Sequence, residues 1–194
     1  MSTAADNDAS DEALMTRLRR GDDAALAPLM ARWEVPMKRY LARIVQNAHE
    51  AEELAQETFV RLYQHRDRFR DGARFSPWLY AIAANLARNR LRWWRRRPAV
   101  SLEAWTEFGH DTADESSAGR AASGALEQRE CAAAVREAVA ALPVELREAL
   151  VLCEYEGLAQ AEAAEALGVT PKAVETRLYR ARARLRNRLQ RWLA

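Results

Sequence analysis

Basic and polar side chains recur along one face of a predicted helix near the C-terminus, residues 171–192. This face lies opposite the apolar Val174 and Leu178. Its members are Lys172, Glu175, Thr176, Arg177 and Arg180. A helix that enters the major groove of DNA presents polar residues to base edges near its N-terminus and arginines to phosphates behind them. The pattern predicts binding to duplex DNA; the alternative is an ordinary helical hairpin with a solvated arginine face.

The residues before this helix follow the order of a helix-turn-helix. A short helix is predicted over residues 159–167, with the small Ala164 where two helices cross. Gly168 follows at the point where the chain needs the left-handed backbone conformation that glycine readily adopts. Thr170 and Pro171 are an N-cap residue and a proline at the first helical position. The capped turn and the basic face together indicate a DNA-reading domain.

A second group combines arginines, amides and indole rings on a helix predicted from Pro77 to about Arg97. From Asn85 to Arg97 the chain has six arginines and no acidic residue. Arginines bind phosphates, asparagines can hydrogen-bond to base edges, and tryptophans can stack on unpaired bases or wedge a base step open. The pattern predicts contact with nucleic acid. The alternative is a solvated basic face whose Trp93 and Trp94 lie against the core.

A third predicted helix, residues 49–66, has a small and leucine-rich buried face and a charged exposed face. The exposed face presents Glu52, Glu53, Gln56, Glu57 and Arg61. An acidic helix beside a basic one is usually a solvated surface, so composition alone does not make this face an interaction site.

Catalysis, metal binding and cofactor binding find little support. His49, His65 and His110 are scattered, and no carboxylates stand near them at metal-ligand spacing. The chain has no phosphate-cradling glycine loop and no nucleophile elbow. We therefore expect no catalytic residue, no metal and no cofactor, and a protein that is not an enzyme.

The two cysteines, Cys131 and Cys153, have no CxxC spacing, which argues against a disulfide framework or a zinc site. A reducing cytosol is favoured, and a redox switch between the two thiols stays an alternative. No stretch approaches 18 uninterrupted apolar residues, and the N-terminal residues are acidic rather than basic and then apolar. We expect no signal peptide, no membrane insertion and a cytoplasmic location.

Apolar residues recur every three or four positions through most of the chain, and no alternating strand pattern is present. The fold class is therefore predicted to be all-α, with two small helical domains joined by a flexible acidic linker. The predicted parts are a disordered tail (1–10), a helical domain (11–97), the linker (98–124) and a helix-turn-helix domain (125–194). Pro36 is expected to kink or break its helix, and Ser76 with Pro77 is expected to start the basic one.

Charge is unevenly distributed although the formal net charge is only +2. Residues 1–97 carry 18 basic and 13 acidic side chains, residues 98–128 carry 1 and 6, and residues 129–194 carry 11 and 9. Two mildly basic domains thus flank an acidic connector. The positive charge of each domain is concentrated at its C-terminal end, which favours anionic partners there.

Three segments, in their order and spacing, closely resemble those of bacterial RNA polymerase sigma factors: HEAEELAQETFVRLY, FRDGARFSPWLYAIAANLARNRLRWWRRR and LPVELREALVLCEYEGLAQAEAAEALGVTPKAVETRLYRARARL. Two domains with a short linker are similar to the extracytoplasmic-function group of this family. The resemblance covers about residues 11–97 and 125–192. It implies a transcription initiation factor that binds core RNA polymerase and promoter DNA.

The resemblance also implies roles for particular residues. The segment Glu52–Arg61 is similar to the helix that docks on the clamp helices of the polymerase, with Glu53, Gln56 and Glu57 as the main contacts. The segment Leu142–Glu156 is similar to the part that packs on the polymerase flap.

For promoter DNA, the loop Phe69–Pro77 resembles the pocket that captures a base flipped out of the −10 element, with asparagines beneath it and arginines on nearby backbone. The residues implied for the −10 element are Phe69, Phe75, Ser76, Trp78, Asn85, Arg88, Asn89, Arg92 and Arg95. Those implied for the −35 duplex are Lys172, Glu175, Thr176, Arg177 and Arg180. The linker would thread toward the RNA exit path, and an anti-sigma factor would hold the protein inactive.

This sequence departs from the family pattern at several places. Ala159 and Ala163 stand where a serine cap and an isoleucine are common, which predicts a helix weakened by about 1 kcal/mol through the lost cap. Glu175 stands where a basic residue is frequent; it would repel phosphate but could accept a hydrogen bond from a cytosine amino group. Trp93 and Trp94 stand at positions where arginine is commoner in the family.

Two other classes of function stay open from the sequence. A helix-turn-helix regulator that acts without polymerase explains the C-terminal domain but gives no role to residues 52–61 and 76–97. A pure interaction protein, which mimics a sigma factor and sequesters another regulator, predicts partner binding without DNA affinity.

Overall fold

The computed structural model describes residues 9–97 and 122–192. Every regular element in these two ranges is helical, as the all-α prediction requires. Most of the predicted tail and linker lie outside the described residues. Within the described part, no helix is long and apolar enough to cross a membrane.

The first range folds into four α-helices and two short 3-10 turns. They are α2 (Asp11–Arg19), η1 (Asp23–Ala25), α3 (Leu26–Val45), α4 (Ala48–Gln64), η2 (Arg66–Arg68) and α5 (Phe75–Arg96). Of the two outcomes expected at Pro36, a kink or a break, the break does not occur, because α3 continues through this residue. Proline removes one backbone hydrogen bond from a helix. Fully buried side chains before and after it, such as Leu29 and Met37, hold both halves of α3 against the same core.

Aromatic rings fill the centre of this first range. Tyr40, Phe75 and Tyr80 are almost fully buried. The ring of Trp33 lies edge-to-face with that of Phe75 at 5.6 Å between centroids, and Tyr40 lies edge-to-face with Tyr80 at 5.0 Å. Such pairs are favourable beyond the area that they bury. They fix α5 against α3.

The second range contains the predicted helix-turn-helix. Its elements are α7 (Ala122–Ala140), α8 (Val144–Leu150), the π-helical turn η3 (Val151–Tyr155), α9 (Gln160–Leu167), α10 (Pro171–Arg188) and the 3-10 turn η4 (Gln190–Trp192). Gly168 has φ 66° and ψ 38°, so the predicted left-handed glycine is confirmed. The Thr170 hydroxyl accepts a hydrogen bond from the backbone N–H of Ala173 at 3.2 Å, which confirms the predicted cap.

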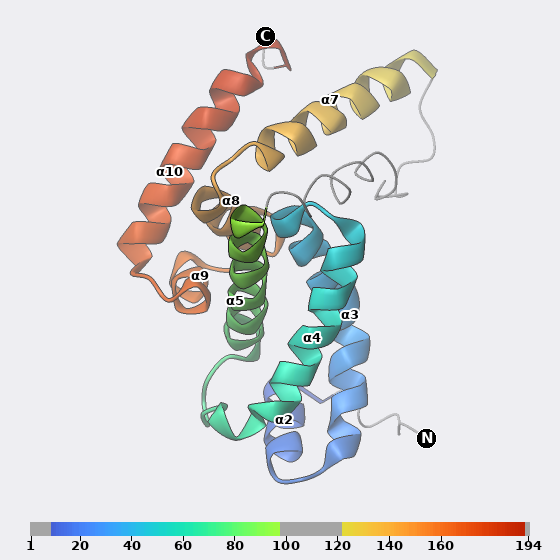
Figure 1. Cartoon of the computed structure of the whole chain (residues 1–194), viewed down its shortest axis with the longest axis vertical. Helices are drawn as coiled ribbons and strands as arrows, with labels where there is room; N and C mark the ends of the chain where they lie inside the picture. Colours follow the sequence, from blue (N-terminus) through green and yellow to red (C-terminus); the bar gives the residue numbers. More distant parts are fainter. Residues whose placement is uncertain (1–8, 98–121, 193–194) are drawn as a thin grey trace.

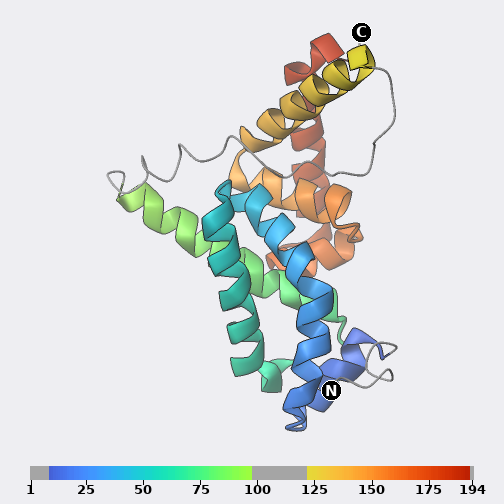
Figure 2. The ribbon, with the colours of Figure 1, turned by 90° about the vertical axis from the view of Figure 1, so that its right-hand side faces the viewer.

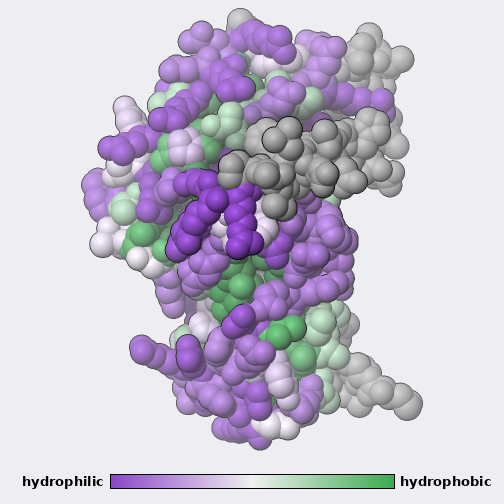
Figure 3. Space-filling model, viewed as in Figure 1, coloured by the Kyte–Doolittle hydropathy of each residue, from purple (hydrophilic) through white to green (hydrophobic). Residues whose placement is uncertain are grey.

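The helix α5 lies between the two groups of helices (Figure 1). It packs on α3 and α4 with one side and on α9 with another, while α8 lies against α3. The buried side chains of both ranges belong to one contiguous apolar cluster. Figure 2 shows that the C-terminal end of α5 projects beyond the helices that it packs on. Hydrophilic residues cover most of the face in Figure 3.

The two helices of the turn start with different caps. Ala159 is the N-cap residue of α9 and has no side-chain acceptor, as the sequence predicted. Its own backbone N–H donates to the Glu162 carboxylate at 2.8 Å, so half of a capping box remains. Its φ of −62° and ψ of 153° are those of a normal N-cap residue.

We therefore predict that Ala159→Ser raises the free energy of unfolding by about 1 kcal/mol, because the serine hydroxyl can accept the unpaired N–H of the first turn. Thr170→Ala should lower it by about the same amount for the opposite reason. Urea unfolding followed by circular dichroism measures both changes. A serine variant with the unfolding midpoint of the wild type would contradict the prediction.

Candidate nucleic-acid and partner interfaces

The basic half of α5 presents its polar side chains outward. Asn85, Asn89, Arg92 and Arg95 are all exposed and occur three or four residues apart, so they share one side of the helix. Trp93 is 40% exposed, whereas Trp94 is half-buried and packs against the core. The structure thus separates the two tryptophans: Trp93 is the more exposed, and the Arg97 guanidinium lies over its ring, 5.2 Å from the centroid.

Arg88 is held by groups of the same chain. Its Nη2 donates to the Asn85 side-chain oxygen at 2.8 Å. Its Nη1 lies 3.4 Å from the backbone oxygen of Leu167 in α9 and 3.7 Å from Oε2 of Glu148 in α8. A residue predicted to bind DNA backbone is therefore engaged by the C-terminal helices in this arrangement.

The loop before α5 differs in exposure from one predicted residue to the next. Phe69 and Phe75 are 2% and 0% exposed, so in this arrangement their rings are buried beneath the loop. The ring of Trp78 lies edge-to-face with that of Phe69 at 5.3 Å and stays half-exposed, as does Ser76. The predicted cap at Ser76 is wrong: α5 begins at Phe75, and its N-cap residue Arg74 makes no side-chain capping bond.

The acidic face of α4 is exposed but not without counter-charges. Among the predicted polymerase contacts, Glu52, Glu53, Gln56 and Arg61 are exposed and Glu57 is half-exposed. Arg61 Nε donates to Glu57 at 2.6 Å, and Arg90 of α5 lies 3.4 Å from Glu53. Arg90 also pairs with Glu50. The face keeps its predicted members together on one side of α4.

The first turns of α10 hold the predicted duplex-reading residues. Lys172 Nζ lies 2.8 Å from a Glu175 carboxylate oxygen, and the Thr176 hydroxyl donates to the backbone oxygen of Lys172 at 2.8 Å. Arg180 is exposed and Arg177 half-exposed. The charge of Glu175, which departs from the family pattern, is compensated by Lys172.

The sequence did not single out two buried charged neighbours in α8. Arg147 Nη1 donates to the backbone oxygen of Ile44 at 2.7 Å, and Nη2 donates to those of Ala140 and Leu142 at 2.5 and 2.9 Å. Burial lowers the pKa of the Arg147 guanidinium to about 10. The side chain links α8 to the end of α3. Its only signal in the sequence is a charge within an apolar stretch.

Glu148, the second neighbour, is 1% exposed. Burial raises the pKa of its carboxyl to about 7, against the opposing attraction of Arg88 and Arg177. The Glu148 Oε1 atom and the Tyr40 hydroxyl have no hydrogen-bond partner among the described residues. In α5, the Tyr80 hydroxyl donates to Glu156 at 2.8 Å. Charged and polar groups thus join the two ranges across their contact.

Within residues 9–97 and 122–192, no group of three or more His, Cys, Asp or Glu side chains could hold a metal ion. Cys131 and Cys153 are free thiols of intermediate exposure. Burial, as the larger cause, and the neighbouring Glu154 raise the pKa of the Cys153 thiol, which makes it less reactive.

Comparison with known proteins gives matches over both ranges. The family described as Sigma-70 region 2 matches residues 29–97, and Sigma-70, region 4 matches residues 132–185. The RNA polymerase sigma-H factor of Pseudomonas aeruginosa is 34% identical over 185 residues, which are 93% of this chain and 94% of the relative. The ECF RNA polymerase sigma factor SigW of Bacillus subtilis is 30% identical over 181 residues, 90% and 94% of the two chains.

Solved structures match over the same length. CnrH, in complex with the cytosolic domain of CnrY, is 28% identical with a TM-score of 0.67, covering 93% of this chain and 97% of CnrH. The sigma factor RpoE of Bartonella quintana, in complex with the anti-sigma factor NepR, has a TM-score of 0.62 at 22% identity, over 83% and 94% of the chains. The second likeness concerns the fold alone.

The raised pKa of Glu148 predicts a pH dependence of folding. A carboxyl whose folded pKa lies above its ordinary value stabilises the fold most at low pH, and this stability is lost as pH rises through about 7. The charged and titratable groups around it are Arg88, Arg177, Glu145, Arg147 and Tyr40. We expect the wild type to lose free energy of unfolding relative to Glu148→Gln as pH rises from about 4.5 to about 7, and the difference to level off above that pH.

The glutamine variant imitates the protonated carboxyl and keeps every histidine, so the difference between the two proteins isolates Glu148. Urea unfolding at several pH values measures it. Parallel stability profiles for the two proteins would show that Glu148 does not titrate across this contact.

Proposed function

The chain belongs to the sigma-70 family of bacterial RNA polymerase sigma factors, in its extracytoplasmic-function group, and on this premise we propose how it directs core polymerase to promoters. One observation carries the proposal. Two helices with exposed basic faces, α5 and α10, lie in two separately matched regions of a single chain. One chain can therefore hold a promoter at two places.

We propose the following division of labour: residues 11–97 dock on the polymerase clamp and read the −10 element, and residues 125–194 read the −35 element. Residues 98–124 connect the two domains. The protein acts in the cytoplasm, where the polymerase and the chromosome are. It contributes binding and positioning, and no catalytic step of its own.

At the −35 element, α10 enters the major groove as a duplex reader. Lys172, Thr176, Arg177 and Arg180 contact bases and phosphates, and their half or full exposure supports this role. Glu175 and Lys172 pair with each other in this structure. When Lys172 moves to a phosphate, Glu175 becomes free to accept a hydrogen bond from a cytosine amino group.

At the −10 element, the two DNA strands separate and a base flips out toward the loop at residues 69–77. Flipping costs a few kcal/mol, which contacts with polymerase and protein offset. Ser76 and Trp78 border the flipped base, Asn85 and Asn89 lie further along α5, and the arginines hold backbone. Arg88 must first release Glu148 and the Leu167 carbonyl, so α9 moves off α5 when the promoter binds.

On the polymerase, the exposed side of α4 docks on the clamp. In this arrangement the predicted flap-binding segment, residues 142–156, has Leu146, Leu150 and Leu152 buried inside the protein. The same movement that frees Arg88 would expose it. Binding to polymerase and opening of the two domains are thus coupled.

An anti-sigma factor is the proposed regulator. CnrH, which matches nearly the whole chain, is in complex with the cytosolic domain of another protein, CnrY. A partner that binds the packed arrangement better than the open one would keep the α5 face covered.

A purified core polymerase tests the proposed function. The chain should co-elute with it and support transcripts from a defined set of promoters that core polymerase alone does not start. A helix-turn-helix regulator predicts DNA binding without co-elution, and a sigma mimic predicts partner binding without DNA binding. Either of these results would overturn the proposal.

We predict that the double variant Glu53→Lys, Glu57→Lys loses measurable binding to core polymerase, because one exposed and one half-exposed contact reverse their charge. The matched control reverses Glu127 and Glu130, two exposed acids of α7 that lie outside both matched family regions. Gel filtration with core polymerase and circular dichroism are the measurements. Normal holoenzyme formation by the Glu53 and Glu57 variant would refute the assignment of α4.

We also predict that Arg177→Ala weakens −35 binding by about 1–3 kcal/mol, because the helix loses a contact to DNA at the start of its basic face. Holoenzyme binding to a duplex −35 fragment, measured by fluorescence anisotropy at fixed salt, gives the change. An unchanged affinity would remove Arg177 from the interface.

A further inference from the structure

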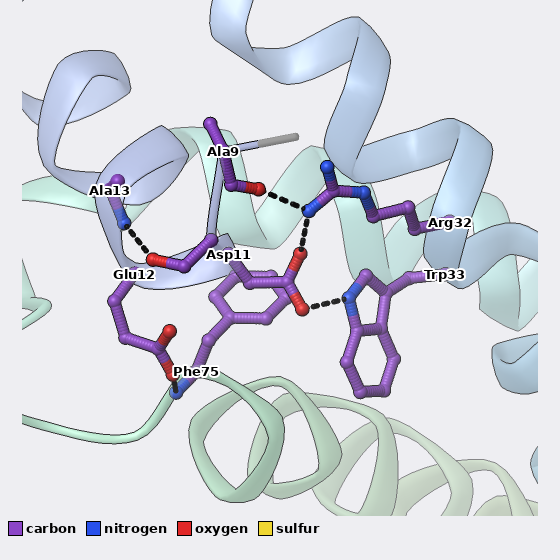
Figure 4. Close-up of polar contacts among 8 residues, drawn as sticks. Ala9, Asp11, Glu12, Ala13, Arg32, Trp33 and Phe75 are labelled. Carbon is purple, nitrogen blue, oxygen red and sulfur yellow. Dashed lines mark hydrogen bonds and ion pairs between the residues drawn. The ribbon is translucent and has the colours of Figure 1, made fainter. Parts of the chain in front are cut away.

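Helix α2 contacts both ends of the loop that precedes α5. At the start of the loop, Arg19 Nη1 donates to the backbone oxygen of Phe69 at 2.7 Å, and Nη2 donates to the Asp71 carboxylate at 2.5 Å. At the end of the loop, the backbone N–H of Phe75 donates to the Glu12 carboxylate at 3.1 Å, as Figure 4 shows. One short helix thus holds both ends of a seven-residue segment.

The Glu12 contact replaces a cap that α5 lacks. The first backbone N–H groups of a helix have no partner inside the helix. Arg74, the N-cap residue, supplies no side-chain acceptor, and Ser76 lies within the helix. The Glu12 carboxylate supplies that acceptor, and its charge is favourable at the positive end of the helix dipole. A residue 63 positions earlier therefore fixes where α5 begins.

The position of α2 is itself fixed by its neighbour α3. The Asp11 carboxylate accepts hydrogen bonds at 2.9 Å from Arg32 and from the indole N–H of Trp33 (Figure 4). The Ser10 hydroxyl caps α2 by accepting from the N–H of Ala13 at 3.2 Å. Glu12 follows Asp11 directly, so the carboxylate that caps α5 stands on an anchored turn.

The loop has a buried apolar side and an exposed side. Phe69 and Phe75 are buried, with their ring centroids 6.4 Å apart, and form its floor. The residues between them are exposed except for the half-exposed Ala73. Gly72 makes the turn with φ 79°, a conformation that favours glycine. Arg74 reaches Glu162 of α9 in the packed arrangement. The hydrogen bonds that Arg19 and Glu12 make to the loop do not involve α9, so they stay when α9 moves away.

We propose that Glu12 and Arg19 are positioning residues that hold the loop at residues 69–75 in the shape that receives the flipped −10 base. The proposal rests on the proposed function of this loop. Helix α2 lies outside the two matched family regions, which begin at residue 29. A loop held in advance loses less conformational entropy when the base binds, so its grip on that base is tighter and more selective.

The test uses holoenzyme made with the full chain and a forked DNA whose −10 bases are single-stranded, taken from a promoter that the wild type starts. We expect Glu12→Ala and Arg19→Ala each to weaken binding to this DNA about 5- to 10-fold and to narrow the preference for the natural base over the other three at the flipped position. Glu12→Gln keeps an acceptor oxygen and should restore most of the preference. Binding to core polymerase and to a duplex −35 fragment should stay at the wild-type level.

The matched control is Glu34→Ala, which removes an exposed carboxylate of α3 that pairs with Lys38 on the same helix. It should change none of these measurements. Two results would overturn the proposal: unchanged base preference in the Glu12 and Arg19 variants, or an equal loss of polymerase, −35 and −10 binding, which indicates general unfolding. If the wild-type holoenzyme shows no preference for the natural base at the flipped −10 position, the proposed function of the loop is wrong. The positioning role then fails as well.

Discussion

The packing of α5 is the constraint on which the rest of the structure depends. This helix has an apolar side, on which Phe75, Leu79 and Ala83 are completely buried, and a basic side that is exposed. Burial of large side chains contributes roughly 1.5–3 kcal/mol each, far more than any exposed arginine contact. The apolar side therefore sets the orientation of α5, and the basic side follows from it.

The same helix also explains why the two ranges pack together here. The α9 helix lies on α5, and the contact is completed by buried charges that are not fully paired, Arg147 and Glu148 among them. Such groups cost free energy when they lose water without full compensation. The contact is thus one that a strong partner can replace. This composition suits the proposed exchange of the internal contact for polymerase and DNA.

The all-α class and the helix-turn-helix could be predicted from the sequence because helical periodicity, Gly168 and the Thr170–Pro171 cap are local signals. The errors came from contacts between distant residues. Ser76 has the type and position of a cap, yet Glu12 performs this task from another helix. The burial of Phe69 and Phe75 likewise depends on how the loop packs against the core, which the local pattern does not show. Nothing in the local pattern could show that Arg147 reaches the Ile44 carbonyl, because that contact depends on how two helix groups pack.

The central claim is that one chain holds a promoter as duplex at one place and as separated strands at another, with polymerase as the scaffold. Footprinting of the holoenzyme on a promoter that it starts, combined with permanganate probing of unpaired thymines, tests this most directly. We predict two protected segments, with permanganate reactivity confined to the downstream one. A single protected segment without unpaired thymines would contradict the account and leave a duplex-binding protein.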